Sequence, residues 1–215
     1  MNKQRYALVT VDVEALPKRA CAEHVKRLMW GKHDKGSAGV REMCSIGREF
    51  AVRHVFFVDQ CGAYDQLDEI HEVVRWLDGA GQDVHLHTHP EYLPADFWTA
   101  RGLESGPEHM NKYTDAARAE LVIAYFAQLL SSVTGKPIRA HRAGSFRWNA
   151  CTISALAAAD IPLSFNNSMY AMHAGQCPYS EPTNHPYLWS NGVIEVPMTE
   201  RRILPGIGKE KWWAR

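Results

Sequence analysis

Short apolar runs rich in β-branched residues alternate with longer segments of helical periodicity along this chain of 215 residues. Such runs predict buried strands, and they lie at 6–13, 55–58, 83–89, 138–142, 163–165 and 193–196. Amphipathic or apolar helical patterns lie between them, at 40–52, 65–77, 115–132 and 148–159. Strands that alternate with helices in this way indicate an α/β fold with a parallel sheet.

Polar side chains follow the first five predicted strands. Barrel enzymes place their chemistry at the carboxyl ends of many strands, whereas an open doubly wound sheet does so only near its switch point. We therefore expect a single-domain, distorted (β/α) barrel over residues 1–215, closed or nearly closed.

Composition narrows the range of partners and compartments. Lysine plus arginine and aspartate plus glutamate number 24 each, so nothing predicts a nucleic-acid partner or an anionic membrane surface. The five cysteines form no CxxC pair and are expected to be reduced thiols. We find no signal-peptide pattern, and no apolar run approaches the ~20 residues of a membrane helix. The expected compartment is the cytoplasm, and the oligomeric state is left open.

Three histidines alternate at the end of the third predicted strand, in His85-Leu86-His87-Thr88-His89-Pro90. Residues two apart on a strand point to the same side, so these imidazoles can converge. Neutral imidazole is a good ligand for zinc and similar divalent ions. The pattern therefore predicts a metal site and disfavours a merely solvated strand end.

Asp12 and Glu14 are also two apart, at the end of the first strand. Near a metal, such a pair divides naturally into one ligand and one general base. Arg142 leaves the fourth strand into Ala143-Gly144-Ser145, where little side-chain bulk surrounds it. That setting suits an arginine that orients a carboxylate through bidentate hydrogen bonds.

Together these motifs resemble those of the NodB-homology polysaccharide deacetylases, carbohydrate esterase family four. The resemblance extends from Tyr6 to about Met198 and includes the order of the motifs along the chain. It implies a metal-dependent hydrolase that removes an N-acetyl group from an amino sugar of a polysaccharide or lipopolysaccharide. Asp12 matches the family's catalytic base, and Arg142 matches the arginine that holds this base in position.

The acidic motif departs from the family's usual TFDDG. Val13 stands in place of the second aspartate, which is a metal ligand in the family. Glu14, one position later, would serve instead, as an acid at that position does in some members. The roles of Asp12 and Glu14 are therefore exchangeable at this point.

The family's two histidine ligands are four residues apart, which His85 and His89 would satisfy. A second alignment takes His87 and His89, and we prefer it because it keeps the strand in register. It also resembles an LHxHP pattern of deacetylases associated with lipopolysaccharide O-antigen. The resemblance implies zinc as the metal, with cobalt or nickel as alternatives.

The substrate would be an acetylated amino sugar or glycan. Trp98, with its neighbour Phe97, is a candidate surface for a sugar ring, and we also expect Ser145 and Asn166 to contact the substrate. Asn166 replaces the acid of the family's fourth motif. The histidine of the fifth motif, a general acid, has no match after residue 193, which leaves three weak candidates: His141, His173 and His185.

Two other functions are compatible with these motifs. One is a related amidohydrolase that acts on a small cyclic amide or ureide, with or without a metal. The other is a catalytically inactive glycan-binding protein on the same fold, which the departures from the family motifs favour. A third interpretation is that the chain ends before a C-terminal segment of the enzyme.

Overall fold

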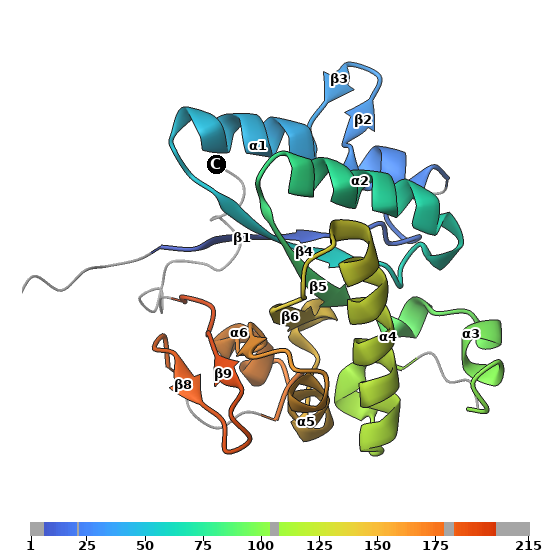
Figure 1. The fold of residues 1–215 in the computed structure, drawn as a ribbon, viewed down its shortest axis with the longest axis vertical. Helices are drawn as coiled ribbons and strands as arrows, with labels where there is room; N and C mark the ends of the chain where they lie inside the picture. Colours follow the sequence, from blue (N-terminus) through green and yellow to red (C-terminus); the bar gives the residue numbers. More distant parts are fainter. Residues whose placement is uncertain (1–6, 21, 104–107, 179–182, 201–215) are drawn as a thin grey trace, which may run out of the picture.

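The computed structural model describes residues 7–20, 22–103, 108–178 and 183–200. A seven-stranded sheet in the order β1-β4-β5-β6-β7-β9-β8 organises them (Figure 1). Neighbouring strands are parallel except for β8, which runs antiparallel to β9. The strands are β1 (Val9–Val13), β4 (His54–Asp59), β5 (Asp83–Thr88), β6 (Ala140–Ala143), β7 (Leu163–Ser164), β8 (Tyr187–Leu188) and β9 (Ile194–Glu195).

The parallel strands follow one another across the sheet in chain order, without a reversal. Because parallel crossovers are right-handed, this order places the connecting helices on one face of the sheet. Accordingly, α2 contacts β5 and α4, and α4 contacts α5. The helices are α1 (Val40–Glu49), α2 (Leu67–Gly79), α3 (Ala95–Thr99), α4 (Ala116–Thr134), α5 (Ala150–Ala158) and α6 (Met169–His173).

The predicted α/β fold with a mostly parallel sheet is confirmed, but a closed barrel is not found. Among the described residues, β1 and β8 are the two edges of an open sheet. The ladder also narrows toward β8, because β7, β8 and β9 have two residues each. Periodicity locates strands along a chain, whereas closure depends on pairing between its distant ends, which periodicity does not report.

Side-chain alternation gives the sheet two different faces. Phe56, Val58 and Leu86 point into the main core beneath the helices. On the opposite face, Phe57 packs with Phe165 in a small second cluster. The polar side chains of the candidate site share that opposite face.

Several elements lie outside the strands and helices that the sequence predicted. These are a hairpin of β2 (Lys32–His33) and β3 (Gly36–Ser37), the short helices α3 and α6, and β8. Five further single turns are η1 (Val25–Met29), η2 (Tyr64–Gln66), η3 (Pro90–Tyr92), η4 (Met110–Lys112) and η5 (Gly144–Phe146). Tyr6, the predicted start of the first strand, lies outside the described residues.

Helix α4 is long and apolar enough to cross a membrane by length and composition, contrary to the expectation that no segment of the chain approaches this. This is weak evidence for a membrane span, because core helices of globular proteins meet the same criterion. Here Val122, Phe126 and Leu130 are completely buried in the main core, beside α2, α5 and β5. Packing within the chain thus accounts for the buried third of this apolar segment.

Candidate metal centre

The carboxyl end of β5 lies in the middle of the sheet, between β4 and β6. Register places His87 opposite Asp59 on one side and opposite Arg142 on the other. His89 follows two residues later, just beyond the strand. Side chains from the ends of β1, β4, β5 and β6 therefore meet at the carboxyl end of the sheet.

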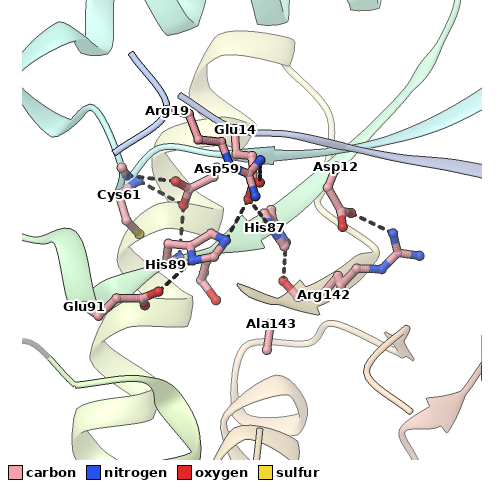
Figure 2. A network of polar contacts seen from close by, with 12 residues as sticks. Asp12, Glu14, Arg19, Asp59, Cys61, His87, His89, Glu91, Arg142 and Ala143 are labelled. Carbon is pink, nitrogen blue, oxygen red and sulfur yellow. Dashed lines mark hydrogen bonds and ion pairs between the residues drawn. The ribbon is translucent and has the colours of Figure 1, made fainter. Parts of the chain in front are cut away.

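Glu14, His87 and His89 form a compact group at this carboxyl end (Figure 2). Their ligand atoms all lie within 4.8 Å of one another. Glu14 Oε2 is 2.7 Å from His89 Nε2 and 3.4 Å from His87 Nε2. Both imidazoles are buried. One carboxylate and two imidazoles are a donor set that zinc and related divalent ions accept.

Hydrogen bonds on the far side of each ring determine which nitrogen faces the group. His87 Nδ1 donates to the carbonyl oxygen of Arg142 at 2.8 Å, because a carbonyl can only accept. His89 Nδ1 donates to a Glu91 carboxylate oxygen at 2.7 Å. Both Nε2 atoms are thereby directed toward Glu14. Metal-binding histidines are held in this way by carboxylates and backbone carbonyls, so the group fits a divalent metal ion.

The charges of this group are strongly coupled. Burial alone would lower the pKa of His89, but hydrogen bonds to Glu14 and Glu91 raise it from 6.5 to about 10. Burial would raise the pKa of Glu14, yet hydrogen bonds to His87 and His89 hold it well below its ordinary value. In the absence of a metal, the site thus stores a proton on His89 between two carboxylates.

Arg142 connects the metal group to Asp12. Its guanidinium donates to Asp12 Oδ1 at 2.6 Å and to Thr10 Oγ1 at 2.8 Å, while its backbone carbonyl holds His87 (Figure 2). The side chain is buried against the Phe57 ring, 4.4 Å from the ring centroid. The expected bidentate contact is therefore divided between Asp12 and Thr10.

Asp59 is a buried part of the site that the sequence analysis left unassigned. Its carboxylate accepts hydrogen bonds from the backbone N–H groups of Cys61, Gly62 and His89, at 3.1, 2.8 and 3.0 Å. It thereby ties the end of β4 to the residue that follows β5. An acid that ends an apolar strand, as Asp12 does, is the signal that could have found it.

Glu91, His109 and Arg19 were also missed. Glu91 lies in the turn after His89-Pro90, and His109 Nδ1 is 3.0 Å from its carboxylate. Arg19 pairs with the second oxygen of Glu14 from an exposed position. Local sequence carried little signal for these residues, because each acquires its partner only through folding.

His85 lies outside the group formed by Glu14, His87 and His89. It lies on the same face of β5 as His87 but two residues farther from the carboxyl end, opposite Phe57. There its Nδ1 accepts a hydrogen bond from the backbone N–H of Arg139 at 3.4 Å. The geometry thus favours the alignment that uses His87.

The predicted sugar platform is not available at the surface. Trp98 is completely buried, with an edge-to-face contact to Phe97 and with Arg118 over its ring. Phe97 is also buried, and it stacks on Phe126 of α4. Helix α3 directs both rings into the core, so the prediction that Trp98 contacts the substrate is wrong for this structure.

Asn166 is likewise buried, and hydrogen bonds within the chain occupy its amide. Its oxygen accepts from the backbone N–H of Ala143 at 2.6 Å, and its nitrogen donates to Ser164 Oγ at 2.9 Å. It therefore joins β6 to the end of β7, and its burial and internal hydrogen bonds argue against the expected contact with substrate. Ser145 is exposed in the turn after β6, so it remains a candidate for contact with the substrate.

The three histidines considered as general acids lie elsewhere. His141 is completely buried, where burial lowers its pKa to about 3, and its Nε2 is 2.9 Å from Thr88 Oγ1. It faces the helices, away from the site. His173 and His185 are exposed, at the end of α6 and before β8. Neither belongs to the candidate metal group of Glu14, His87 and His89 found among the described residues.

Solved structures with a similar fold include carbohydrate deacetylases. A proposed polysaccharide deacetylase from Mycobacterium smegmatis superposes with a TM-score of 0.61 and 17% identity, over 95% of this chain and 64% of that one. The two proteins share a fold. The chain thus spans less than two thirds of the length of that protein, and an identity this low supports the fold alone.

Weaker likenesses are to the BpsB deacetylase domain from Bordetella bronchiseptica and to a CE4 family pseudoenzyme from Bacillus anthracis. The first has a TM-score of 0.45 at 14% identity, over 74% of this chain and 62% of that one. The second has a TM-score of 0.46 at 10% identity, over 69% of this chain and 38% of that one. No family model and no curated protein matches the sequence.

Proposed function

We propose that this protein is a metal-dependent hydrolase that removes the N-acetyl group of an amino sugar. The observation that carries the proposal is the double role of Arg142, whose carbonyl orients His87 and whose guanidinium holds Asp12. One residue thereby sets the distance between a three-donor metal group and an unligated carboxylate. A hydrolase that activates water needs this combination of metal ligands and an adjacent base.

Glu14, His87 and His89 would hold the metal, which when bound lowers the pKa of a water molecule and polarises the substrate carbonyl. Asp12 is the general base in this proposal, because it stands beside the group without belonging to it. Arg142 and Thr10 fix its position on β1. Glu91 and the Arg142 carbonyl keep both imidazoles in the tautomer that offers Nε2.

The proposal also names a metal, a substrate class and a compartment. We favour zinc because the donor set mixes imidazole and carboxylate, with cobalt or nickel as substitutes. We favour an acetamido sugar of O-antigen or lipopolysaccharide biosynthesis as the substrate, on the LHxHP resemblance. The cytoplasm is the proposed compartment, because the five cysteines form no CxxC pair and their spacing shows no disulfide framework.

The first test combines metal content with turnover. Wild type is expected to hold about one equivalent of a divalent transition metal, and the double variant His87→Ala/His89→Ala is expected to lose it. Asp12→Asn should keep the metal yet release acetate at least about 100-fold more slowly. Asp68→Asn, at an exposed position on α2, is the matched control and should behave as wild type. Elemental analysis and an acetate assay on acetylated sugars are the measurements.

Three outcomes would change the proposal. Full activity of Asp12→Asn would remove the base assignment. Wild type that takes up no metal, even when zinc, cobalt and nickel are offered, would shift the interpretation to a metal-free amidohydrolase for cyclic amides. Sugar binding without acetate release in the metal-loaded protein would leave a glycan-binding protein.

A further inference from the structure

Two cations occupy a single turn beside the metal group. The turn spans Leu16–Arg19, with Pro17 at its second position and a hydrogen bond from Arg19 N–H to the Leu16 carbonyl at 2.9 Å. Proline at this position presets the backbone of such a turn, so its shape is largely decided before any ligand arrives. Lys18 and Arg19 are both exposed there.

The two side chains are anchored on different sides of the site. Arg19 pairs with Glu14, yet its side chain remains 60% exposed. Lys18 Nζ lies 5.6 Å from the centroid of the Tyr92 ring, and that ring lies 5.9 Å from the His89 ring. A cation over an aromatic face is attracted by the ring's negative potential. The turn therefore extends along the metal group from Glu14 to His89.

These cations retain unused hydrogen-bonding capacity. A guanidinium has five N–H donors and an ammonium has three, and both groups suit phosphate oxygens. Among the described residues, no carboxylate forms an ion pair with Lys18. The acidic residues of the site, by contrast, are committed to histidine, backbone or arginine partners. The solvent-facing rim on this side of the centre is therefore cationic.

We propose that Lys18 and Arg19 bind an anionic group of the substrate, so that the acetamido sugar carries a phosphate close to the scissile amide. This inference rests on the proposed function, because it assumes that a sugar occupies the metal centre. Tyr92 is a positioning residue in this arrangement and acts through Lys18. A neutral glycan would give the remaining donors of Lys18 and Arg19 no anionic partner.

The test compares an anionic and a neutral probe in the metal-loaded protein. N-acetylglucosamine 1-phosphate and N-acetylglucosamine are titrated by calorimetry, and the ratio of their Kd values is the readout. Wild type should prefer the phosphate, and Lys18→Gln should reduce this preference roughly five- to tenfold. Lys32→Gln, which changes another exposed lysine, on the β2–β3 hairpin, is the control and should retain it.

Tyr92 variants separate positioning from general disruption. Tyr92→Phe keeps the ring beneath the Lys18 ammonium and should preserve the preference, whereas Tyr92→Leu should reduce it as Lys18→Gln does. A third probe, uridine diphosphate N-acetylglucosamine, identifies the source of the phosphate. Tighter binding than the monophosphate indicates a diphosphate-linked sugar, and weaker binding indicates a free phosphomonoester.

Failure of this inference is distinguishable from failure of the proposed function. Equal Kd values for the two probes in wild type, or a preference that survives Lys18→Gln, would overturn the anionic subsite. Acetate release from the neutral sugar would then still support the hydrolase. Loss of the preference in Lys18→Gln, without acetate release from any probe, would support the subsite and refute the hydrolase.

Discussion

Individual residues at the proposed metal centre fix one another's orientation through hydrogen bonds. His87 and His89 each have one nitrogen occupied by a fixed acceptor, which leaves the other nitrogen directed at Glu14. Asp59 adds a hydrogen bond to the backbone N–H of His89. Metal affinity at such a centre depends on these supporting contacts as well as on the ligands themselves.

Glu91 offers a direct test of this dependence. Glu91→Gln should weaken metal binding about 10- to 100-fold, because a neutral amide is a poorer acceptor for His89 Nδ1 and can turn its nitrogen toward the ring. Competition with a chromophoric chelator measures the change. Glu69→Gln, at an exposed position on α2, serves as the control and should bind metal as wild type does. Equal affinities for the two variants would exclude Glu91 from a supporting role.

At the scale of elements, the turn after β6 is shaped to lie against His89, a proposed metal ligand. Ser145 and Phe146 both have φ of 53°, a conformation that side chains other than glycine rarely adopt. Gly144 precedes them, and a Cβ at this residue would lie 2.6 Å from His89 Nε2. The strained turn thus brings bare backbone against the His89 ring.

Gly144→Ala should therefore displace His89. We expect a loss of about 1–3 kcal/mol in the free energy of unfolding, together with loss of the bound metal. Thermal unfolding and elemental analysis measure the two effects. Gly79→Ala is the control, since a Cβ there meets nothing within 4 Å and alanine favours the helix. Normal metal content in Gly144→Ala would show that His89 can shift without cost.

At the scale of the whole molecule, stability without metal should depend on the His89 proton. The pKa of His89 is about 10 in the folded protein, against an ordinary value of 6.5. A raised pKa contributes stability that is complete below about pH 6.5 and disappears as the pH rises through about 10. Glu14 has a depressed pKa, so its contribution is lost on the acid side of its ordinary value of 4.5.

The metal-free wild type should therefore be more stable than His89→Gln at low pH, and this difference in stability should decrease as the pH rises. The difference in Tm between wild type and this variant should be largest near about pH 6 and should shrink by about pH 10. Thermal unfolding in the presence of a chelator measures it across that range. A difference that stays constant or widens would contradict a stored proton. Because metal must displace this proton, metal affinity should rise with pH.

The sequence by itself determined the alternation of elements and the polar ends of the strands. Periodicity located β1, β4, β5 and β6, because the spacing of buried side chains is a local property. It also predicted that Asp12 and Glu14 share one side of their strand, as do His87 and His89. Motif order along the chain then indicated which kind of chemistry to expect.

Only the tertiary structure decided how these residues divide into groups. Strand register separated His85 from His87, and a contact across the sheet assigned Arg142 to Asp12. Packing buries Trp98 in the core. Among the described residues, β1 does not pair with β8, so the sheet is open. These outcomes depend on contacts between residues far apart in the chain, for which local periodicity carries no signal.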